Sequence, residues 1–316
     1  WPRWIVGATR SSVPVCLFGP FPTIISEDNS YDFEVQRYMR AAAGEGGKID
    51  IAASTEAKKQ KTFIYQGKHN SAGIIETDSA PPIPIDKAAL TASLQFSKIL
   101  NSNISPVIQP MRKTVADGSN TTGFQRTALI ARGGQLETTE GIVRIENISL
   151  EEDSCRTIEN HPDKKIYHLD RLGIPLIEVG TAPDIISPKH CQETAKKLGN
   201  FLRALPNCKR GLGTIRQDVN VSIKTGTRVE IKGAQDLKMV PDLVRLEATR
   251  QHHLIKLKNE LEEKNLHIKE DLEQVDITIL LAGSESKRLK TNKEKGGVIK
   301  AIKLSGWNTL LGKELA

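Results

Sequence analysis

The sequence predicts an α+β fold in which a mixed sheet is flanked by helices. Residues 105–180 alternate strand-like runs with glycine-rich turns, and residues 215–222 alternate strictly between polar and apolar side chains. Residues 87–100 and 187–205 instead repeat their apolar side chains at helical spacing. With 316 residues, the chain is long enough for two domains.

Few helices and strands are predicted in the N-terminal part of the sequence. Residues 1–30 are interrupted by proline and serine, so we expect a loop with at most one short strand. Residues 31–40 place apolar side chains three and four apart, which predicts a short amphipathic helix. Residues 61–66 favour a strand, and the prolines within residues 79–86 prevent a helix from starting before Lys87.

The remaining elements follow from apolar periodicity and capping. The apolar run at residues 174–180 is typical of a strand buried on both faces. A serine N-cap followed by proline begins a helix over residues 187–205. Residues 240–263 predict a long charged helix, residues 264–295 are weakly patterned, and residues 296–304 open another strand.

Composition restricts the class of protein. Lys plus Arg number 45 against 38 Asp plus Glu, a net charge of +7 that permits a polyanionic partner without requiring one. Four scattered cysteines without a CxxC pair argue against structural zinc or disulfides and for a reducing compartment. No segment reads as a membrane span or signal peptide, so we expect a cytoplasmic protein. The chain lacks an initiator Met and stops soon after a strand-like run, which indicates a fragment.

The pair of segments 215–222 and 227–233 predicts a β-hairpin with one polar face. Along its first strand Arg216, Asp218 and Asn220 project to the same side, each about 6–7 Å from the next. The second strand adds Arg228, Glu230 and Lys232 at the same step. Such a wall suits phosphates and a divalent cation. A solvated hairpin with cross-strand ion pairs explains the pattern equally well.

Carboxylates gather at two further places. Residues 151–153 form an acidic cluster where a strand is expected to end, and Glu178 lies inside an apolar run. A carboxylate is costly in such a run unless a cation meets it, so the two places together predict a Mg²⁺ site. The alternative for residues 151–153 is a simple turn cap. Asp170 and Arg171 are expected to form a salt bridge.

A glycine-bracketed loop lies between two predicted strands. Gly118 and Gly123 enclose small hydroxyl and amide residues, which is the chemistry of a loop that cradles phosphate or carboxylate. It is not a P-loop, because the Gly-Lys-Ser/Thr ending is absent. A plain polar hairpin turn is the commoner explanation for this composition.

At these motifs the sequence resembles a known family. The runs MRKTVADGSNTTGFQRTALIARGG, SLEEDSCRTIE, YHLDRLGIPLIEVGTAPDI, KRGLGTIRQDVNVSI and RVEIKGAQDL follow the order found in the GatB/GatE family of glutamyl-tRNA(Gln) amidotransferases, which contains archaeal E-type and bacterial B-type subunits. The resemblance extends from about Leu17 to the C-terminus. The tail at 285–315 is similar to the entry into an insertion domain shared with aspartyl-tRNA synthetases. The implied domains are a catalytic mixed-sheet cradle at 1–258, a connector at 259–284 and an incomplete insertion domain at 285–316.

The resemblance implies a reaction and its machinery. ATP and Mg²⁺ would be used to phosphorylate the glutamyl γ-carboxylate of misacylated Glu-tRNA(Gln), and ammonia from an asparaginase-like D-type subunit would convert it to the amide. The two subunits would form a heterodimer or a dimer of heterodimers. Phosphoryl transfer of this kind needs positioning and charge neutralisation more than acid–base groups. By similarity the metal would lie on Glu151 and Glu178, which with Arg126 and Asp218 are the expected catalytic residues. Residues expected around the nucleotide or activated carboxylate are Ser119, Asn120, Thr122, Arg216, Asn220, Glu230 and Lys232.

The chain departs from the family pattern near its start. Gly7–Ser11 replaces a segment that carries Glu and His in the family, so metal affinity is expected to fall. The alternative function is therefore a catalytically impaired paralogue or fragment that only binds tRNA or the partner. A third possibility, a B-type subunit, would require A- and C-type partners. The form of GTIRQDVNVSI and of the C-terminal tail instead resembles the E type.

Overall fold

The computed structural model describes residues 3–12, 28–38, 47–49, 51–59, 61–206, 208–210, 214–266, 272–304, 307, 310 and 312, with residues 3–12 and 52 described by their backbone alone. The chain forms two compact units. One comprises residues 1–224 and 228–245, and the other comprises residues 225–227 and 246–316. The predicted domain boundaries at 258 and 284 remain predictions.

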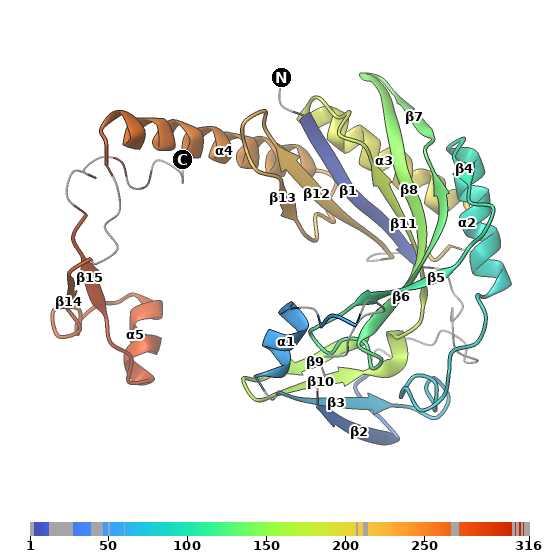
Figure 1. The fold of residues 1–316 in the computed structure, drawn as a ribbon, viewed down its shortest axis with the longest axis horizontal. Coiled ribbons are helices and arrows are strands. Elements are labelled where there is room, and N and C mark those ends of the chain that lie inside the picture. The colour runs from blue at the N-terminus through green and yellow to red at the C-terminus, as the bar shows by residue number, and fades with distance from the viewer. Residues whose placement is uncertain are drawn as a thin grey trace. The chain divides into compact units, whose positions relative to one another are not determined.

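A large antiparallel sheet forms the centre of the first unit (Figure 1). Within the described residues it has nine strands, in the order β13-β12-β1-β11-β8-β6-β4, with β5 paired to β6 and β7 paired to β8. The strands are β1 (Arg3–Ser12), β4 (Asn103–Ile104), β5 (Pro110–Thr114), β6 (Phe124–Arg132), β7 (Gln135–Thr138), β8 (Gly141–Glu152), β11 (Pro175–Thr181), β12 (Ile215–Ser222) and β13 (Val229–Ile231).

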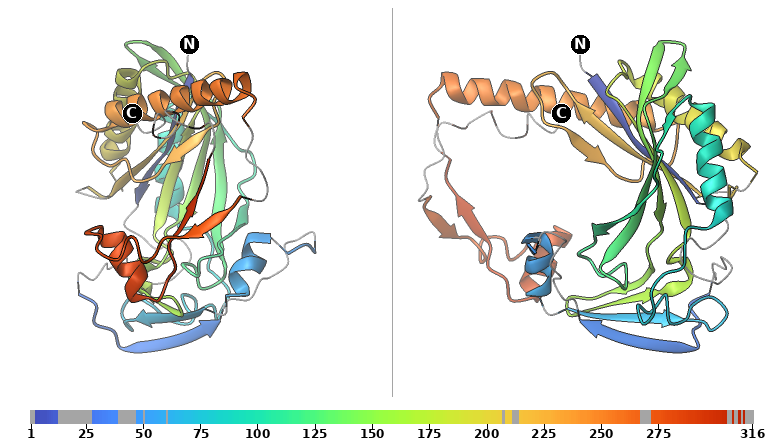
Figure 2. Two further views of the ribbon diagram at one scale, coloured as in Figure 1. Left: turned by 90° about the vertical axis from the view of Figure 1, so that its left-hand side faces the viewer. Right: turned by 45° about the vertical axis from the view of Figure 1, so that its right-hand side comes forward.

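Two helices, α2 (Lys87–Ile99) and α3 (Pro188–Ala204), cover one face of this sheet (Figures 1 and 2). The predicted N-cap Ser187 accepts a hydrogen bond from the His190 N–H at 3.0 Å, and in α2 Asp86 accepts one from the Ala89 N–H at 2.9 Å. The apolar faces of the two helices and of the central strands are fully buried. The opposite face of the sheet carries the polar side chains of β12 together with Glu151, Glu178 and the buried Leu176.

A smaller four-stranded sheet lies beyond one end of the large one (Figure 2). It contains β2 (Phe33–Tyr38), β3 (Thr62–Gly67), β10 (Lys164–His168) and β9 (Arg156–Asn160), followed by the short helix η1 (Leu169–Arg171); α1 is Ile51–Ala57. Its core centres on the stacked rings of Tyr65 and Tyr167, 5.7 Å apart. The pair β3–β10 is parallel, so the strand pairing of the unit as a whole is mixed.

Most predicted elements are confirmed, including the strand at 124–132 and the helices at 187–205 and 240–263. The helix predicted over 31–40 is wrong, because residues 33–38 form a strand whose exposure alternates with a period of two. The described part of residues 1–30 includes β1, a ten-residue strand in the middle of the large sheet, where at most a short strand was expected.

The second unit contains most of α4 (Val240–Glu263), the antiparallel pair β14 (Gln274–Asp276) and β15 (Lys300–Ile302), and α5 (Lys287–Glu294). The strand predicted at 296–304 is confirmed as β15. α5 buries no side chain and is rich in lysine. Over the part of the chain that the structure describes, no helix is long and apolar enough to cross a membrane.

Candidate functional site

The polar face of β12 lies on the side of the large sheet opposite α3. Arg216, Asp218 and Asn220 are half-buried, and they alternate with the buried side chains of Gln217, Val219 and Val221. Gln217 marks the covered side, because its Nε2 contacts the carbonyl oxygen of Ala195 in α3 at 3.4 Å. The predicted alternation of this strand is confirmed, and its polar side chains face away from the helices.

Strand register brings the two predicted carboxylates onto this same face. Leu176 is opposite Glu151, and Glu178 lies two residues further along β11, so the two carboxylates are diagonal neighbours. Diagonal neighbours on one face are about 7–8 Å apart, close enough for long side chains to converge. On the other side of Glu178, residue Arg10 of β1 is opposite both Glu178 and Arg216. Strands β8, β11 and β12 therefore contribute side chains to one polar surface, and the backbone of β1 lies between β11 and β12.

The carboxylate of Glu151 is buried and held by three side-chain donors. Its exposed fraction is 2 %. Lys113 Nζ and Thr127 Oγ1 each lie 3.3 Å from Oε1, and Gln125 Nε2 lies 3.3 Å from Oε2. A buried carboxylate needs such donors to offset its lost hydration. Their convergence from β5 and β6 fixes Glu151 in position on the polar face.

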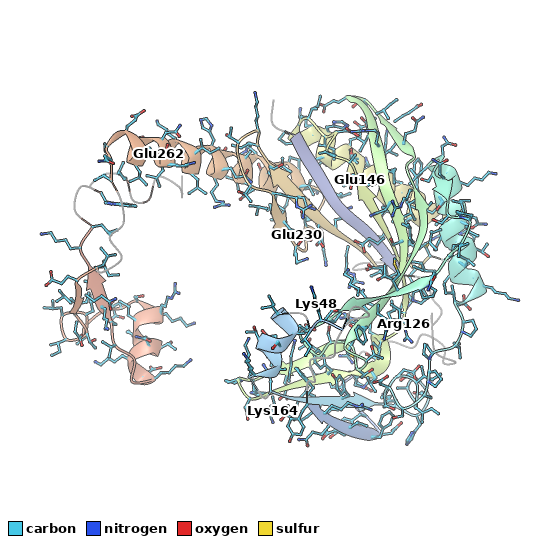
Figure 3. The ribbon with its side chains drawn as sticks, viewed as in Figure 1. Lys48, Arg126, Glu146, Lys164, Glu230 and Glu262 are labelled. Carbon is cyan, nitrogen blue, oxygen red and sulfur yellow. The ribbon has the colours of Figure 1, made fainter. Side chains whose placement is uncertain are left out.

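Arg126 does not reach this face. Adjacent residues of a strand point to opposite sides, so Thr127 contacts Glu151 while Arg126 contacts Glu152. Arg126 donates to Glu152 from Nε at 2.9 Å, and its own backbone N–H donates to the same carboxylate at 3.2 Å. Burial raises the pKa of Glu152 even though the charge of Arg126 opposes that shift. Figure 3 shows Arg126 on β6, separate from the hairpin that carries Glu230. Arg126 is thus engaged in an ion pair with Glu152, at 2.8 Å.

Arg216 is anchored by a carboxylate to which the sequence patterns assigned no specific role. Arg216 donates to Asp153 from two nitrogens, at 2.9 and 3.4 Å, and Arg171 Nε lies 3.6 Å from the same carboxylate. The predicted salt bridge between Asp170 and Arg171 is wrong, because Asp170 pairs with Arg156 at 3.0 Å. The acidic cluster at 151–153 drew attention to Asp153 in the sequence. Its partner Arg216 could not be predicted from the sequence, because the two residues are 63 positions apart.

The β12–β13 hairpin carries the remaining predicted residues. Asp218 accepts a hydrogen bond from the Gly233 N–H at 3.1 Å, and Lys232 Nζ lies 3.0 Å from Glu230 and 3.9 Å from Asp218. Asn220 is directly opposite Glu230. The Lys232–Asp218 contact is a cross-strand ion pair of the kind that the sequence left as an alternative, whereas Lys232 and Glu230 lie on the same arm of the hairpin.

The loop between Gly118 and Gly123, called the glycine loop below, packs against the small sheet. Gly118 has φ +76°, and a Cβ there would lie 2.5 Å from the Phe63 ring, so only glycine allows this approach. Asn120 accepts a hydrogen bond from Ser154 Oγ at 2.9 Å. Ser119 donates its backbone N–H to Asp117 at 2.9 Å. Burial disfavours the charged form of Asp117, but hydrogen bonds from Ser119 together with a nearby lysine hold its pKa below the usual value.

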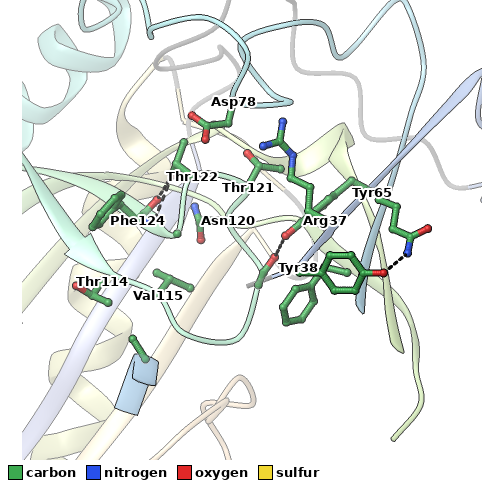
Figure 4. Close-up of a pocket in the computed structure, with 15 residues that line it drawn as sticks. Arg37, Tyr38, Tyr65, Asp78, Thr114, Val115, Asn120, Thr121, Thr122 and Phe124 are labelled. Atoms are coloured by element: carbon green, nitrogen blue, oxygen red, sulfur yellow. Dashed lines mark hydrogen bonds between the residues drawn. The ribbon is translucent and has the colours of Figure 1, made fainter. Parts of the chain in front are cut away.

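Asn120 and Thr122 face a different space from Glu151. They line a cavity of about 540 Å³ together with residues of β2 and β3, and Ser119 is not part of its lining (Figure 4). The predicted site residues therefore separate into two places: the polar face of the large sheet, and a cavity beside the small one.

Glu151 and Glu178 supply enough carboxylate ligands for a magnesium site in which water and substrate provide the other ligands. Among the described side chains, no group of three His, Cys, Asp or Glu residues could hold a metal. Mg²⁺ in phosphoryl-transfer sites is commonly bound by one or two carboxylates, with water and substrate phosphates completing its shell. Glu151 and Glu178 supply two oxygen ligand groups on one face, so these residues fit the ion.

Comparison with known proteins gives a consistent match. The family profile described as the GatB/GatE catalytic domain matches residues 29–300. A protein of Methanocaldococcus jannaschii, named as the E-type subunit of glutamyl-tRNA(Gln) amidotransferase, is 45 % identical over 300 residues, which is 95 % of this chain and 47 % of that relative. Relatives of the same name in Methanococcus vannielii and Saccharolobus solfataricus are 44 % and 45 % identical over 95 % and 96 % of this chain. The chain spans about half the length of these relatives, 47 % and 48 % for the last two.

Proposed function

Because this chain belongs to the GatB/GatE catalytic-domain family, we propose that it is the catalytic part of an archaeal E-type amidotransferase subunit, which converts Glu-tRNA(Gln) to Gln-tRNA(Gln). The observation that carries the proposal is the polar face on which strand register gathers Glu151, Glu178 and Arg216. Two carboxylates beside an anchored arginine suit transfer of a phosphoryl group to a carboxylate.

The proposed reaction has two balanced steps. An oxygen of the glutamyl γ-carboxylate attacks the γ-phosphorus of ATP, and ADP leaves. Ammonia then attacks the γ-carbon, the C–O bond to phosphate breaks, and the amide is released together with hydrogen phosphate, which takes up the proton that the nitrogen loses. The ammonia would come from an asparaginase-like D-type subunit, in a heterodimer or a dimer of heterodimers with the E-type one.

The residues of the polar face have distinct roles in this scheme. Glu151 and Glu178 would hold Mg²⁺, which when bound would neutralise charge on the nucleotide phosphates. Arg216, oriented by Asp153, would bind an oxygen of the transferred phosphoryl group. Asn220, Asp218, Glu230 and Lys232 would bind the nucleotide at the hairpin edge. Arg126 would act indirectly, by holding the strand that carries Thr127 against Glu151.

The proposal also assigns a domain to the C-terminal residues and a cellular compartment to the protein. Residues 285–316 would be the first part of an insertion domain like that of aspartyl-tRNA synthetases. The protein would work in the cytoplasm, where tRNA is aminoacylated.

The experiment uses the full-length protein with ATP, Mg²⁺, Glu-tRNA(Gln) and ammonium chloride, which supplies ammonia without the partner. Product is measured as Gln-tRNA(Gln). Glu178→Gln and Glu151→Gln should each lower the rate by about 100-fold or more, because a neutral amide is a weak magnesium ligand. Glu146→Gln, an exposed position on β8 (Figure 3), is the matched control and should leave the rate unchanged. Full activity of Glu178→Gln would refute the site.

A second candidate is a protein that binds tRNA and partner without catalysing the reaction. It is favoured by Gly7–Ser11, which lies in β1 beside Glu178 and provides no acidic or histidine residue there. Tight binding of Glu-tRNA(Gln) by the unsubstituted protein, with no amide formed at any Mg²⁺ concentration, would establish this alternative.

A further inference from the structure

Positive charge is concentrated in one short segment of the second unit. Residues 285–303, which contain α5 and β15, carry seven lysine and arginine residues against two glutamates. Their net charge of +5 is most of the +7 of the whole chain. Since α5 buries none of its side chains, this charge is presented to solvent and to any partner of opposite charge.

A groove of about 750 Å³ lies between α5 and β15, two elements that are neighbours in Figure 1. Lys287, Thr291 and Lys295 line it at intervals of four residues, so they follow one face of α5 and its C-cap over about 12 Å. Gly296, with φ +70°, ends the helix and lets the chain turn towards β15. The lining holds four cationic side chains and no carboxylate: Lys287, Arg288, Lys295 and Lys300.

The cations of this groove differ from those of α4 in their partners. On α4, three cations pair with carboxylates of the same helix: Arg245 with Asp242, Arg250 with Glu247, and Lys258 with Glu262. On α5, Lys290 pairs with Glu285 at 2.7 Å and lies outside the lining. Within the described residues, three cations of the lining make no ion pair: Lys287, Arg288 and Lys295. A salt-bridged, solvated surface therefore explains α4 but not the groove.

The lining suits a phosphate backbone better than a small anion or a base. Its cations are spread along the groove, so a polymer with phosphates at regular intervals can meet several of them at once. Thr291 and Asn292 add uncharged polar groups of the kind that contact phosphate oxygens. No aromatic side chain lines the groove, so bases have no surface on which to stack.

We propose that the groove between α5 and β15, called the α5 groove, binds the phosphate backbone of RNA without reading its sequence. It belongs to the second unit, whereas Glu151 and Glu178 belong to the first. The choice of RNA among polyanions rests on the proposed function, in which a tRNA is the substrate. The α5 groove raises the affinity and the association rate for that RNA and takes no part in the chemical steps.

The test measures RNA binding by the full-length protein, using fluorescence anisotropy over a range of salt concentrations. The probes are labelled uncharged tRNA(Gln) and an unrelated tRNA. Lys287→Gln, Arg288→Gln and Lys295→Gln should each weaken binding of both probes by about fivefold at about 0.1 M salt. Each should also reduce the slope of log affinity against log salt by about 0.7–0.9, the value for one lost phosphate contact.

Lys293→Gln is the matched control. Lys293 is an exposed lysine of the same helix, makes no ion pair within the described residues and lies outside the lining. Its replacement removes the same charge from α5, so it separates a contact in the groove from a general loss of positive charge. The affinity and the salt slope of this variant should stay close to those of the unsubstituted protein.

The pattern across variants and probes decides the proposal. Groove variants that bind both RNAs with unchanged affinity and slope overturn it and leave the α5 groove to an acidic protein surface. A loss confined to tRNA(Gln) also overturns it, because phosphate contacts carry no sequence information. A loss as large in Lys293→Gln as in the groove variants overturns it as well. Binding is measured without amide formation, so an active enzyme whose groove variants bind normally refutes the α5 groove alone. An inactive protein whose groove variants lose affinity as expected refutes only the catalytic assignment.

Discussion

Asp153 is expected to position Arg216, and the cost of removing it can be estimated from the structure. The Asp153 side chain is 8 % exposed and Arg216 is 30 % exposed, with one contact at 2.9 Å and a weaker one at 3.4 Å. A charged hydrogen bond contributes about 1.5–3 kcal/mol when shielded. Solvent at Arg216 reduces this value. We therefore expect a coupling free energy of about 1–2 kcal/mol between the two side chains.

The assay is a double-mutant cycle with Asp153→Asn and Arg216→Gln, in which the free energy of unfolding is measured by urea denaturation. A matched control is the pair Asp184→Asn and Arg144→Gln. That pair has a bidentate geometry at 2.8 and 2.9 Å but a far more exposed arginine, so its coupling should be smaller. Asp153→Asn should also weaken binding of an ATP analogue, and Asp184→Asn should not. Coupling below about 0.5 kcal/mol for Asp153 and Arg216, or no larger than the control, refutes the reasoning.

Three further predictions follow from the same geometry. Arg10→Glu places a third carboxylate in register with Glu178, so it should tighten Mn²⁺ binding by about tenfold. Electron paramagnetic resonance measures this affinity, and weaker or unchanged Mn²⁺ binding would contradict the prediction. Gly118→Ala should destabilise the protein by about 1–3 kcal/mol, because φ is positive and the Cβ would meet Phe63; an unchanged melting curve would contradict this expectation. Because burial raises the folded-state pKa of Glu152, its contribution to stability is fully present below the unfolded-state pKa and lost as pH rises through the folded value. Relative to Glu152→Gln, the unsubstituted protein should therefore gain stability as pH falls from 7 towards 5, and a difference independent of pH in urea titrations would exclude this linkage.

Local patterns predicted the elements well and their pairing poorly. The polar face of residues 215–222 is visible in sequence because alternation is a property of one strand. By contrast, Glu151 and Glu178 share a face only because β8 pairs with β11 in one register, which no local pattern specifies. The resemblance to the amidotransferase family named both residues but gave no reason for their meeting.

The errors have the same origin. Residues 31–40 are compatible with both a helical and an alternating pattern, and pairing of β2 with β3 selects the strand. The role of Arg126 stays a prediction, and its pairing could not be predicted either: a shift of one residue along β6 sends its side chain to Glu152, whereas Thr127 contacts Glu151. Likewise Arg171 is adjacent to Asp170 in sequence, but its chain neighbour is not its ionic partner.

The β5–β6 hairpin links the two sites mechanically. Lys113 and Gln125 hold Glu151 on one side, and Thr114 and Phe124, the next residues along each strand, line the cavity on the other. The backbone of these two strands therefore couples the cavity side to the carboxylate side, since a shift of Phe124 would also shift two of the three described side-chain donors to Glu151. Phe124→Ala, which touches no proposed metal ligand, should then weaken Mn²⁺ binding measured by electron paramagnetic resonance. An unchanged Mn²⁺ affinity in the folded variant would refute this coupling.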